Sequence, residues 1–381
     1  METLDQIRQE IDETDKQLTE LFIKRMSLAD RVAATKISTF APIFRADRER
    51  DILDSVARAM PDELTTKGKS FFTSLMLLSR EKQYSAYIMG GAFPKSVLPF
   101  SDSTPISTEK ICYYGDIGSW CNLAAKEFSK TSEMYGVTKF SDVFHEVSCG
   151  NASAGILPVE NSTAGSIREV YDLLSQYDLF ISGALTLEIK YCLACKENAD
   201  MSTVKKVYSH VQSLAQCKEY LEKHGFSAEP FKNTAGAAKY VSDSNDTTYA
   251  ALCNRWAADE YSLKVIASDI CDETSNTTRF IVVTKKPFIS DDADTISIKF
   301  TVNHESGTLS HVLDIFRDLG ININKLESRP IPNEKFRYSF YLDFCGRLDE
   351  HNVLALLLQL ESELSELKVL GNYKIKEQTS W

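Results

Sequence analysis

The sequence lacks several features that would assign it to a membrane, secreted or nucleic-acid-binding class. No stretch approaches the roughly 18 apolar residues that a transmembrane helix needs, so we expect no membrane association. Residues 1–8 are charged and show no signal-peptide pattern. Positive charge is in deficit, with 43 Lys and Arg against 54 Asp and Glu and a net charge of −11. Such a negative field disfavours nucleic acid as a partner, and we expect a cytoplasmic protein.

Three chemical motifs are also missing. No strand pattern is followed by G-x-G-x-x-G, so we expect no dinucleotide site, and no G-x-S-x-G elbow supports a serine hydrolase. Cys192 and Cys195 have the spacing of a zinc or redox pair, but no second pair completes a metal site. We therefore interpret the nine cysteines as small buried hydrophobic residues, and we expect neither a metal nor another cofactor.

The chain is long enough for several hydrophobic cores. Its 381 residues, 43% hydrophobic and 25% charged, predict two or three soluble globular domains. Helical periodicity covers residues 4–36, about 47–61 and 70–89, and Gly, Pro, Ser and Thr then break all periodicity. We predict a multidomain protein with an all-α domain at 1–90, a linker at 91–107, an α/β domain at 108–286 and an α+β domain at 293–381.

The central α/β domain is predicted to have two lobes. Strand and helix patterns alternate over residues 111–159 and again over 204–252, and two such lobes imply a cleft between them. In the first lobe, the segment 155–166 runs from an apolar strand into a polar turn, and a helix is predicted to follow. Backbone N–H groups at that helix start, with the hydroxyls of Ser162 and Thr163, would cradle a carboxylate or phosphate. A well-capped helix is the simpler interpretation.

Polar residues lie at the ends of four predicted strands of this domain: those at 115–119, 160–166 and 209–212 come at the ends where strands finish, and those at 278–279 precede the last strand. In order they resemble the Gly-Pro-x-Gly-Ser/Thr loop, the Glu-Asn turn, the Ser-His-Pro-Gln segment and the Thr-Arg-Phe of prephenate dehydratases. The resemblance implies that Thr278 is an essential catalytic hydroxyl. It also implies contacts to prephenate from Ser119, Glu160, Asn161, Ser162, Thr163, Ser209, Gln212 and Arg279.

The resemblance is incomplete at three positions. Cys121 stands where the family has Ser or Thr, Val211 replaces Pro, and Tyr191 stands where His is frequent. We leave Cys121 and Tyr191 out of the predicted site. Glu160 is a candidate proton source if it is buried, although a carboxylate at a helix N-terminus is an equally good interpretation of this residue.

Cationic residues follow the predicted helices of the first domain. Arg25 and Lys36 are nearly three whole turns apart, so both can flank one small anion. Arg8 precedes Arg25 by about 25 Å on a straight helix, and the two can serve one ligand only if they come from different chains. Solvated helix faces also carry such residues. As a set, however, the charged and polar residues resemble those of the all-helical chorismate mutase domain: Arg8, Arg25, Lys36, Arg48, Glu49, Ser79 and Gln83.

That resemblance implies roles for this set in converting chorismate to prephenate. The rearrangement is pericyclic and needs no nucleophile, only a clamp that holds the dicarboxylate compact and donors for the ether oxygen. We assign the two carboxylates of chorismate to Arg8, Arg25 and Arg48, with Arg8 supplied by a second chain. Lys36 and Gln83 would donate to the ether oxygen, and Glu49 would hold the ring hydroxyl.

The last domain is predicted to have the order βαββαβ, which is ferredoxin-like. Residues 307–309 open its first helix, and the Glu-Ser-Arg-Pro string at 327–330 ends its second strand. Both resemble the phenylalanine-binding motifs of ACT regulatory domains. The resemblance implies contacts to L-phenylalanine from Gly307, Leu309, Glu327, Ser328, Arg329 and Pro330, and a pairing of two such domains around the effector.

We therefore predict a bifunctional enzyme of phenylalanine biosynthesis that acts on chorismate and then on prephenate, releases phenylpyruvate and is inhibited by L-phenylalanine. It would act as a homodimer or a larger assembly. The alternative hypothesis is a chorismate mutase fused to a non-catalytic phenylalanine-binding sensor. A fused dehydrogenase is disfavoured because the dinucleotide motif is missing.

Overall fold

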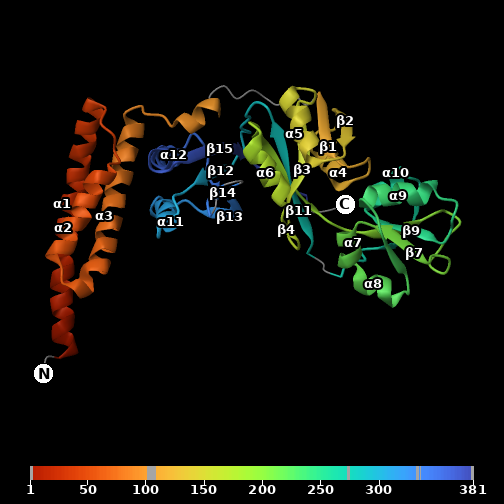
Figure 1. The fold of residues 1–381 in the computed structure, drawn as a ribbon, viewed down its shortest axis with the longest axis horizontal. Coiled ribbons are helices and arrows are strands. Elements are labelled where there is room, and N and C mark those ends of the chain that lie inside the picture. Colours follow the sequence, from red (N-terminus) through yellow and green to blue (C-terminus); the bar gives the residue numbers. More distant parts are fainter. Residues whose placement is uncertain (1–2, 101–108, 273–274, 332–333, 335, 379–381) are drawn as a thin grey trace. The chain divides into compact units, whose positions relative to one another are not determined.

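The computed structural model describes residues 3–100, 109–272, 275–331, 334 and 336–378. The chain forms two compact units (Figure 1). The first consists of Met1–Ser101 with Ile296–Val369, and the second of Asp102–Thr295 with Leu370–Trp381. The multidomain fold is as predicted: helices come first, then an α/β region, then an α+β region. Among the described helices, none has the length and apolarity to cross a bilayer.

The chain begins with three helices, α1 (Leu4–Thr39), α2 (Ala46–Ala59) and α3 (Asp62–Met89). A capping box between Thr3 and Gln6 starts α1, and Phe40 ends it in the left-handed conformation. The start of α3 lies earlier than the predicted residue 70. Asp62 and Glu63 explain this, because acidic side chains favour the first turn of a helix.

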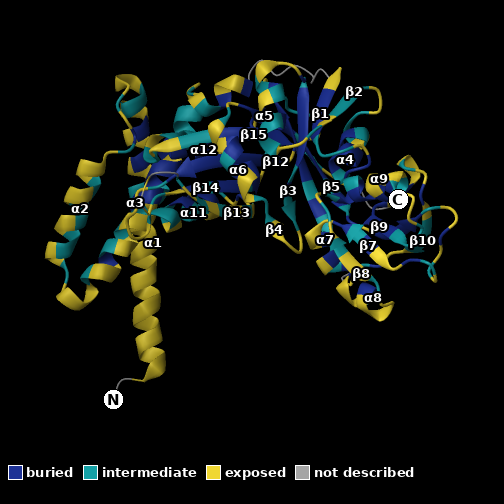
Figure 2. Cartoon of the chain, turned by 45° about the vertical axis from the view of Figure 1, so that its right-hand side comes forward, coloured by how far each residue is buried: buried dark blue, intermediate teal, exposed yellow. Residues whose placement is uncertain are grey.

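Most of α1 makes no packing contact that buries it. Only Ala29 and Ala33 of this helix are buried, whereas Leu4 and Leu21 are 63% and 61% exposed. Figure 2 shows the N-terminal half of the helix exposed along its length. An apolar stripe on an unburied helix face is typical of a surface that binds another protein chain.

The α+β region of the first unit contains a four-stranded sheet in the order β13-β14-β12-β15, so β13 is an edge strand. Phe300, Phe316, Phe344 and Leu356 form part of its core. The observed βαββαβ order matches the prediction. Its elements are β12 (Thr295–Thr301), α11 (Thr308–Asp318), β13 (Ile323–Pro330), β14 (Tyr338–Cys345), α12 (His351–Glu363) and β15 (Glu366–Tyr373).

Helix α3 packs against α11 and α12 within the first unit. The predicted linker also contributes, because residues Lys95–Phe100 form a 3-10 helix, η1. The backbone N–H groups of Lys95 and Ser96 donate to the carboxylate of Glu361 on α12. The helical and α+β regions therefore share polar contacts rather than only a tether.

The second unit contains two sheets, one in each lobe. The first has the order β16-β5-β11-β3-β1-β2, with β4 paired to β3. Its strands are β1 (Lys110–Tyr114), β2 (Glu133–Val137), β3 (Ala154–Asn161), β4 (Gly165–Ser166), β5 (Phe180–Glu188), β11 (Thr277–Thr284) and β16 (Ile375–Gln378). Its helices are α4 (Trp120–Phe128), α5 (Phe140–Cys149) and α6 (Arg168–Gln176).

The other lobe has a five-stranded sheet in the order β10-β6-β9-β7-β8. Its strands are β6 (Cys192–Cys195), β7 (Lys206–Ser209), β8 (Ser227–Pro230), β9 (Tyr249–Cys253) and β10 (Lys264–Ser268). Its helices are α7 (Val211–Gln216), α8 (Lys218–Lys223), α9 (Thr234–Asp243) and α10 (Arg255–Glu260). The two predicted lobes are thus present.

Two local predictions for the second unit are wrong, and one strand was not predicted. The strand expected at 137–140 ends at Val137, because Phe140 begins α5 and packs against Tyr114 with ring centroids 4.2 Å apart. The segment 160–166 forms a hairpin in which β4 returns along β3, and Gly165, with φ of 79°, makes the turn. The expected anion cradle at a helix start is therefore absent there. Strand β16 was not predicted.

Candidate active sites

A hollow of about 380 Å³ is lined by residues from both lobes of the second unit. Of the residues predicted to contact prephenate, Ser119, Asn161 and Gln212 line it, and so does Thr278. Ser119 caps the start of α4, where its side chain accepts from the backbone N–H of Asn122. Residues far apart in the sequence therefore meet at one cavity, because each lies at an end of a strand or at the start of a helix.

Thr278 and Asn161 are paired across the β11–β3 ladder. The Asn161 Nδ2 atom donates to Thr278 Oγ1 at 2.9 Å and to Asn276 Oδ1 at 2.7 Å. Asn161 Oδ1 accepts from the hydroxyl and the backbone N–H of Thr163, which ties the amide to the hairpin turn. Because the threonine oxygen already accepts a hydrogen bond, its own proton is left to donate into the hollow.

Glu160 and Arg279 are the next pair along the same ladder. Arg279 Nη1 lies 3.6 Å from Glu160 Oε2, and neither residue lines the hollow. Successive side chains of a strand point to opposite faces, so this ion pair and the Thr278–Asn161 pair occupy different faces of the sheet. The structure places Arg279 against a carboxylate rather than beside Thr278.

Three more predicted prephenate residues lie outside the hollow. Ser209 is fully buried, and its hydroxyl donates to the carbonyl of Leu252 at 2.6 Å. Ser162 donates to the carbonyl of Ser275 at 3.0 Å. Thr163 accepts from Gln216 Nε2 at 3.0 Å and lines a neighbouring hollow. These hydroxyls hold the backbone and the turn in place.

Several lining residues were missed by the sequence analysis. Lys232 is the one Lys or Arg among the residues that line the hollow, and it precedes Asn233, the cap of α9. Tyr191 also lines it, accepts from Ser213 Oγ at 2.9 Å, and has its pKa raised by burial, so it stays a neutral phenol. Cys121, which was left out of the predicted site together with Tyr191, lines the hollow too. The position after a strand was the available signal for Lys232.

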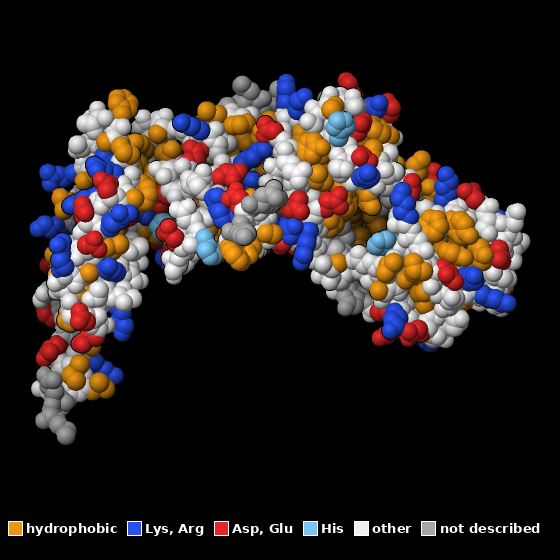
Figure 3. Space-filling model, in the orientation of Figure 1, with side chains coloured by type: hydrophobic (Ala, Val, Ile, Leu, Met, Phe, Trp, Pro, Cys, Tyr) orange, Lys and Arg blue, Asp and Glu red, His pale blue; other side chains and the backbone are white. Residues whose placement is uncertain are grey.

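The helical segment brings together part of the predicted chorismate set, and Figure 3 shows basic side chains gathering over it. Arg25 Nη1 donates to Ser79 Oγ at 2.9 Å. Gln83 is buried, and its Nε2 atom donates to the carbonyl of Ser79 at 2.9 Å. Its Oε1 atom has no hydrogen-bond partner within the described residues. Arg25, Ser79 and Gln83 are thus neighbours on facing turns of α1 and α3.

The other four residues of that set have partners elsewhere or are exposed to solvent. Lys36 Nζ donates to the carbonyl of Ile43 at 2.6 Å, and burial, followed by the charge of Arg45, lowers the pKa of Lys36. Glu49 forms an ion pair with Arg80, and Arg48 is exposed. Arg8 is exposed and pairs with Asp5 at 3.3 Å, four to five helical turns before Arg25 on α1.

The predicted phenylalanine residues fall into two groups. Gly307 and Leu309 line a hollow of about 270 Å³ at the start of α11, where Gly307 has φ of 88°. The other group is the Glu-Ser-Arg-Pro string on edge strand β13, which does not line that hollow. The two predicted phenylalanine-binding motifs therefore lie at separate places within one chain.

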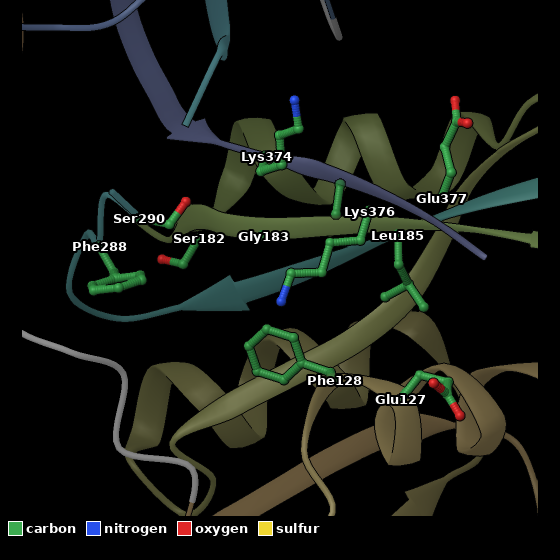
Figure 4. Close-up of a pocket in the computed structure, with 11 residues that line it drawn as sticks. Glu127, Phe128, Ser182, Gly183, Leu185, Phe288, Ser290, Lys374, Lys376 and Glu377 are labelled. Carbon is green, nitrogen blue, oxygen red and sulfur yellow. The ribbon is translucent and has the colours of Figure 1, made fainter. Parts of the chain in front are cut away.

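Figure 4 shows a further hollow of about 270 Å³, lined by α4, β5 and β16. Its floor is apolar, with Phe128 and Leu185, and the ammonium of Lys376 points toward Phe128. Lys374 forms an ion pair with Asp294. None of the predicted site residues lines this hollow.

Comparison with known proteins covers all three regions. Residues 7–84 match the family model of chorismate mutase type II, residues 111–288 that of prephenate dehydratase, and residues 296–362 that of the ACT domain. The bifunctional chorismate mutase/prephenate dehydratase of Aquifex aeolicus (strain VF5) is 32% identical over 383 residues, which is 98% of each chain.

Two solved structures share the fold of the central and C-terminal regions. One, described as a novel type of quorum-quenching acylase, has a TM-score of 0.65 at 24% identity and covers 70% of this chain and 98% of its own. The other is prephenate dehydratase from Arthrobacter aurescens in complex with L-Phe, with a TM-score of 0.63 at 24% identity, covering 69% and 89%. Both establish the fold alone. The near full-length similarity to the Aquifex protein goes further, and with it the chain belongs to the family of bifunctional chorismate mutase/prephenate dehydratases.

Proposed function

We propose that this chain converts chorismate to prephenate on its helical region and prephenate to phenylpyruvate in the hollow between its two lobes. The observation that carries the proposal is the Thr278–Asn161 pair, which presents an oriented hydroxyl to a cavity large enough for a six-membered ring with two carboxylates. The proposed domains are residues 1–90, 108–286 and 293–381. We also propose that the protein acts in the cytoplasm.

In the dehydratase step, prephenate takes up one proton and loses carbon dioxide and water. The bond to the ring carboxylate breaks, its electron pair enters the ring, and the hydroxyl leaves as water, so aromatisation drives the reaction. Thr278 is a poor acid by itself, and its role is to hydrogen-bond the departing hydroxyl or relay a proton to it. Asn161 holds that hydroxyl in position. Ser119 and Gln212 supply further contacts, and Lys232 supplies positive charge for a carboxylate.

The remaining predicted prephenate residues keep supporting roles in this proposal. Glu160 and Arg279 pair on the other face of the ladder, and Ser162, Thr163 and Ser209 hold the hairpin and the strand end. They act by fixing where Asn161 and Thr278 stand, since a catalytic group must be held to within a fraction of an ångström.

In the mutase step, the ether C–O bond of chorismate breaks while a C–C bond forms, and negative charge gathers on the ether oxygen. No proton is gained or lost. Arg25 beside Ser79 and Gln83 provides a cation and an amide on one face of the helix pair. Lys36, Arg48 and Glu49 complete the chorismate site, with the ammonium of Lys36 as a donor for the ether oxygen.

This mutase site is proposed to be shared between two copies of the chain. Arg8 and Arg25 are too far apart on α1 to contact one small ligand, and the apolar stripe that includes Leu4 and Leu21 is exposed. Pairing of two α1 helices would bury that stripe and bring Arg8 of one chain to the site of the other.

L-Phenylalanine is the proposed inhibitor, bound by Gly307, Leu309, Glu327, Ser328, Arg329 and Pro330. The two motifs lie at separate places in one chain, and β13 is an edge strand, so pairing of two ACT domains along this edge would complete the effector site.

One assay separates this proposal from the sensor alternative. Purified protein is given prephenate, and phenylpyruvate is followed by its absorbance in alkali, with and without L-phenylalanine. An enzyme of the proposed kind produces phenylpyruvate and slows when phenylalanine is added. A non-catalytic sensor binds phenylalanine but leaves prephenate unchanged beyond its spontaneous rate.

A further inference from the structure

Arg80 is a buried cation that has no assigned role in either proposed reaction. It follows Ser79 on α3, and only 4% of the residue is exposed. Its Nη1 atom forms an ion pair with Oε1 of Glu49, the residue assigned to the ring hydroxyl of chorismate. The guanidinium also lies over the ring of Phe44, 5.2 Å from its centroid. Arg80 therefore contacts a residue of the predicted mutase site, Glu49.

The opposite edge of the same guanidinium is held by the ACT domain. Arg80 Nε donates to Glu363 Oε1 at 2.8 Å, and Nη2 lies 3.4 Å from Glu363 Oε2, which makes a two-point contact. Glu363 is itself buried, with 4% of its side chain exposed, and His311 Nε2 lies 2.8 Å from its Oε2 atom. Glu363 ends α12, and His311 lies on α11.

This arrangement fixes the direction of Glu49. An unpaired carboxylate on the surface of α2 could adopt many rotamers. The planar guanidinium of Arg80 is held on its opposite edge by Glu363, so the Oε1 atom of Glu49 that pairs with it has one position to occupy. No hydrogen bond to Glu49 Oε2 occurs within the described part of the chain. That oxygen is thus available to a substrate hydroxyl, while Oε1 stays on Arg80.

We infer that Arg80 is a positioning residue for the mutase reaction, and that Glu363 of the ACT domain orients Arg80 in turn. The inference rests on the proposed mutase function of the helical region. It assigns the ACT domain a role in building the mutase site, separate from the binding of an effector.

The first test measures kcat and KM for chorismate in Arg80→Met, Arg80→Lys and Glu363→Gln. We expect Arg80→Met to lower kcat about 10- to 100-fold, the range for losing a hydrogen bond to a charged group. Arg80→Lys should recover part of this loss, because it restores charge but not the two-point contact. Glu363→Gln should lower kcat about threefold to tenfold, although it touches no residue of the chorismate set.

Matched controls come from the same two helices. Lys82→Met removes a cation two residues along α3, where Lys82 pairs with Asp30, and Glu361→Gln changes a neighbouring carboxylate of α12 that accepts from Lys95 and Ser96. Both should keep wild-type mutase kinetics. Dehydratase activity of every variant, measured in the same preparation, reports on folding of the second unit, and thermal unfolding of the same preparation reports on the first.

The deciding test is a double-mutant cycle with Glu49→Gln. If Arg80 acts through Glu49, Arg80→Met costs less than about twofold in the Glu49→Gln background, because the group it positions has already lost its charge. A full additive loss, or unchanged kcat in Arg80→Met, would overturn the inference. Wild-type protein without mutase activity would instead overturn the proposed function, so the two failures are distinguishable.

Discussion

The helical region and the two-lobed region solve the same recognition problem, a ring with two carboxylates, in different ways. The helical region uses charged side chains on helix faces, and its predicted set is incomplete in one chain because Arg8 lies far from Arg25. The two-lobed region places mostly neutral hydroxyls and amides around a hollow, with Lys232 as the lining cation. Helices spread residues along an axis, whereas strand ends gather them at one edge. The proposed mutase site therefore needs a second copy of the chain, whereas the proposed dehydratase site does not.

The largest expected effect is a loss of dehydratase activity that leaves the mutase reaction unaffected. Thr278→Ala should lower the rate of phenylpyruvate formation by about 100-fold or more, as for the loss of a hydrogen-bond donor to a transition state, and should leave mutase kinetics unchanged. Both reactions are measured on one preparation.

Thr277→Ala is the matched control for that experiment. Thr277 precedes Thr278 on β11, and its backbone rather than its hydroxyl bonds to Asn161 and Ser162. Its activity should stay near wild type. Equal losses in the two variants would mean that strand geometry, and not the Thr278 hydroxyl, sets the rate.

The second effect tests sharing of the mutase site. Arg8→Ala and Arg25→Ala should each lose most mutase activity. After mixing and subunit exchange, half of the dimers are mixed and each of these has one intact site, so activity should return to about a quarter of wild type. No recovery, despite exchange shown by native mass spectrometry, would place Arg8 outside the site. Dehydratase activity should not change at any stage.

A smaller effect concerns charge in the hollow. Lys232→Met should raise KM for prephenate about tenfold with little change in kcat, because the ammonium binds a carboxylate that persists in the transition state. Lys239→Met is the control, because Lys239 is an exposed lysine on α9, the helix that begins two residues after Lys232. An unchanged KM in Lys232→Met would show that neutral donors alone bind prephenate.

The smallest expected effect is a pH dependence of stability that arises from Glu81 on α3. Burial, and next the charge of Asp318, raise the pKa of Glu81 to about 7, and its Oε1 atom has no partner among the described residues. Because the folded pKa is above the unfolded value, the contribution of Glu81 to stability is fully present below about pH 4.5 and is lost as pH rises through 7. Glu81→Gln should therefore stabilise the protein at pH 8 by about 1–3 kcal/mol and have little effect at pH 5.

Thermal unfolding at the two pH values checks this prediction. Glu63→Gln, at an exposed position in the first turn of α3, controls for the loss of one negative charge. A stabilisation that is equal at pH 5 and pH 8 would show that Glu81 is ionised in the folded protein at both.

Periodicity was sufficient to predict the three helices and the βαββαβ order. It failed where tertiary pairing decides the structure. The hairpin at 160–166 depends on β4 pairing with β3, and β16 depends on a parallel pairing with β5, nearly 200 residues earlier in the chain. Neither pairing leaves a local pattern in the sequence.

The same limit applies to the sites. The family motifs indicated Asn161, at the end of a recognisable strand, and Thr278, at the start of another, and the structure places them side by side. Motifs could not show that Arg279 would face Glu160 on the other side of the ladder, since that depends on register. Arg80 looked like an ordinary helix cation, and only the positions of Glu49 and Glu363 distinguish it.

The most direct test of the contrast between the two regions is dilution. Specific activities for chorismate and for prephenate are measured over a range of protein concentrations, with the dimer fraction followed by mass photometry. A shared mutase site predicts that mutase activity falls in proportion to the dimer fraction while dehydratase activity stays constant. Full mutase activity in a sample of monomers would contradict the account.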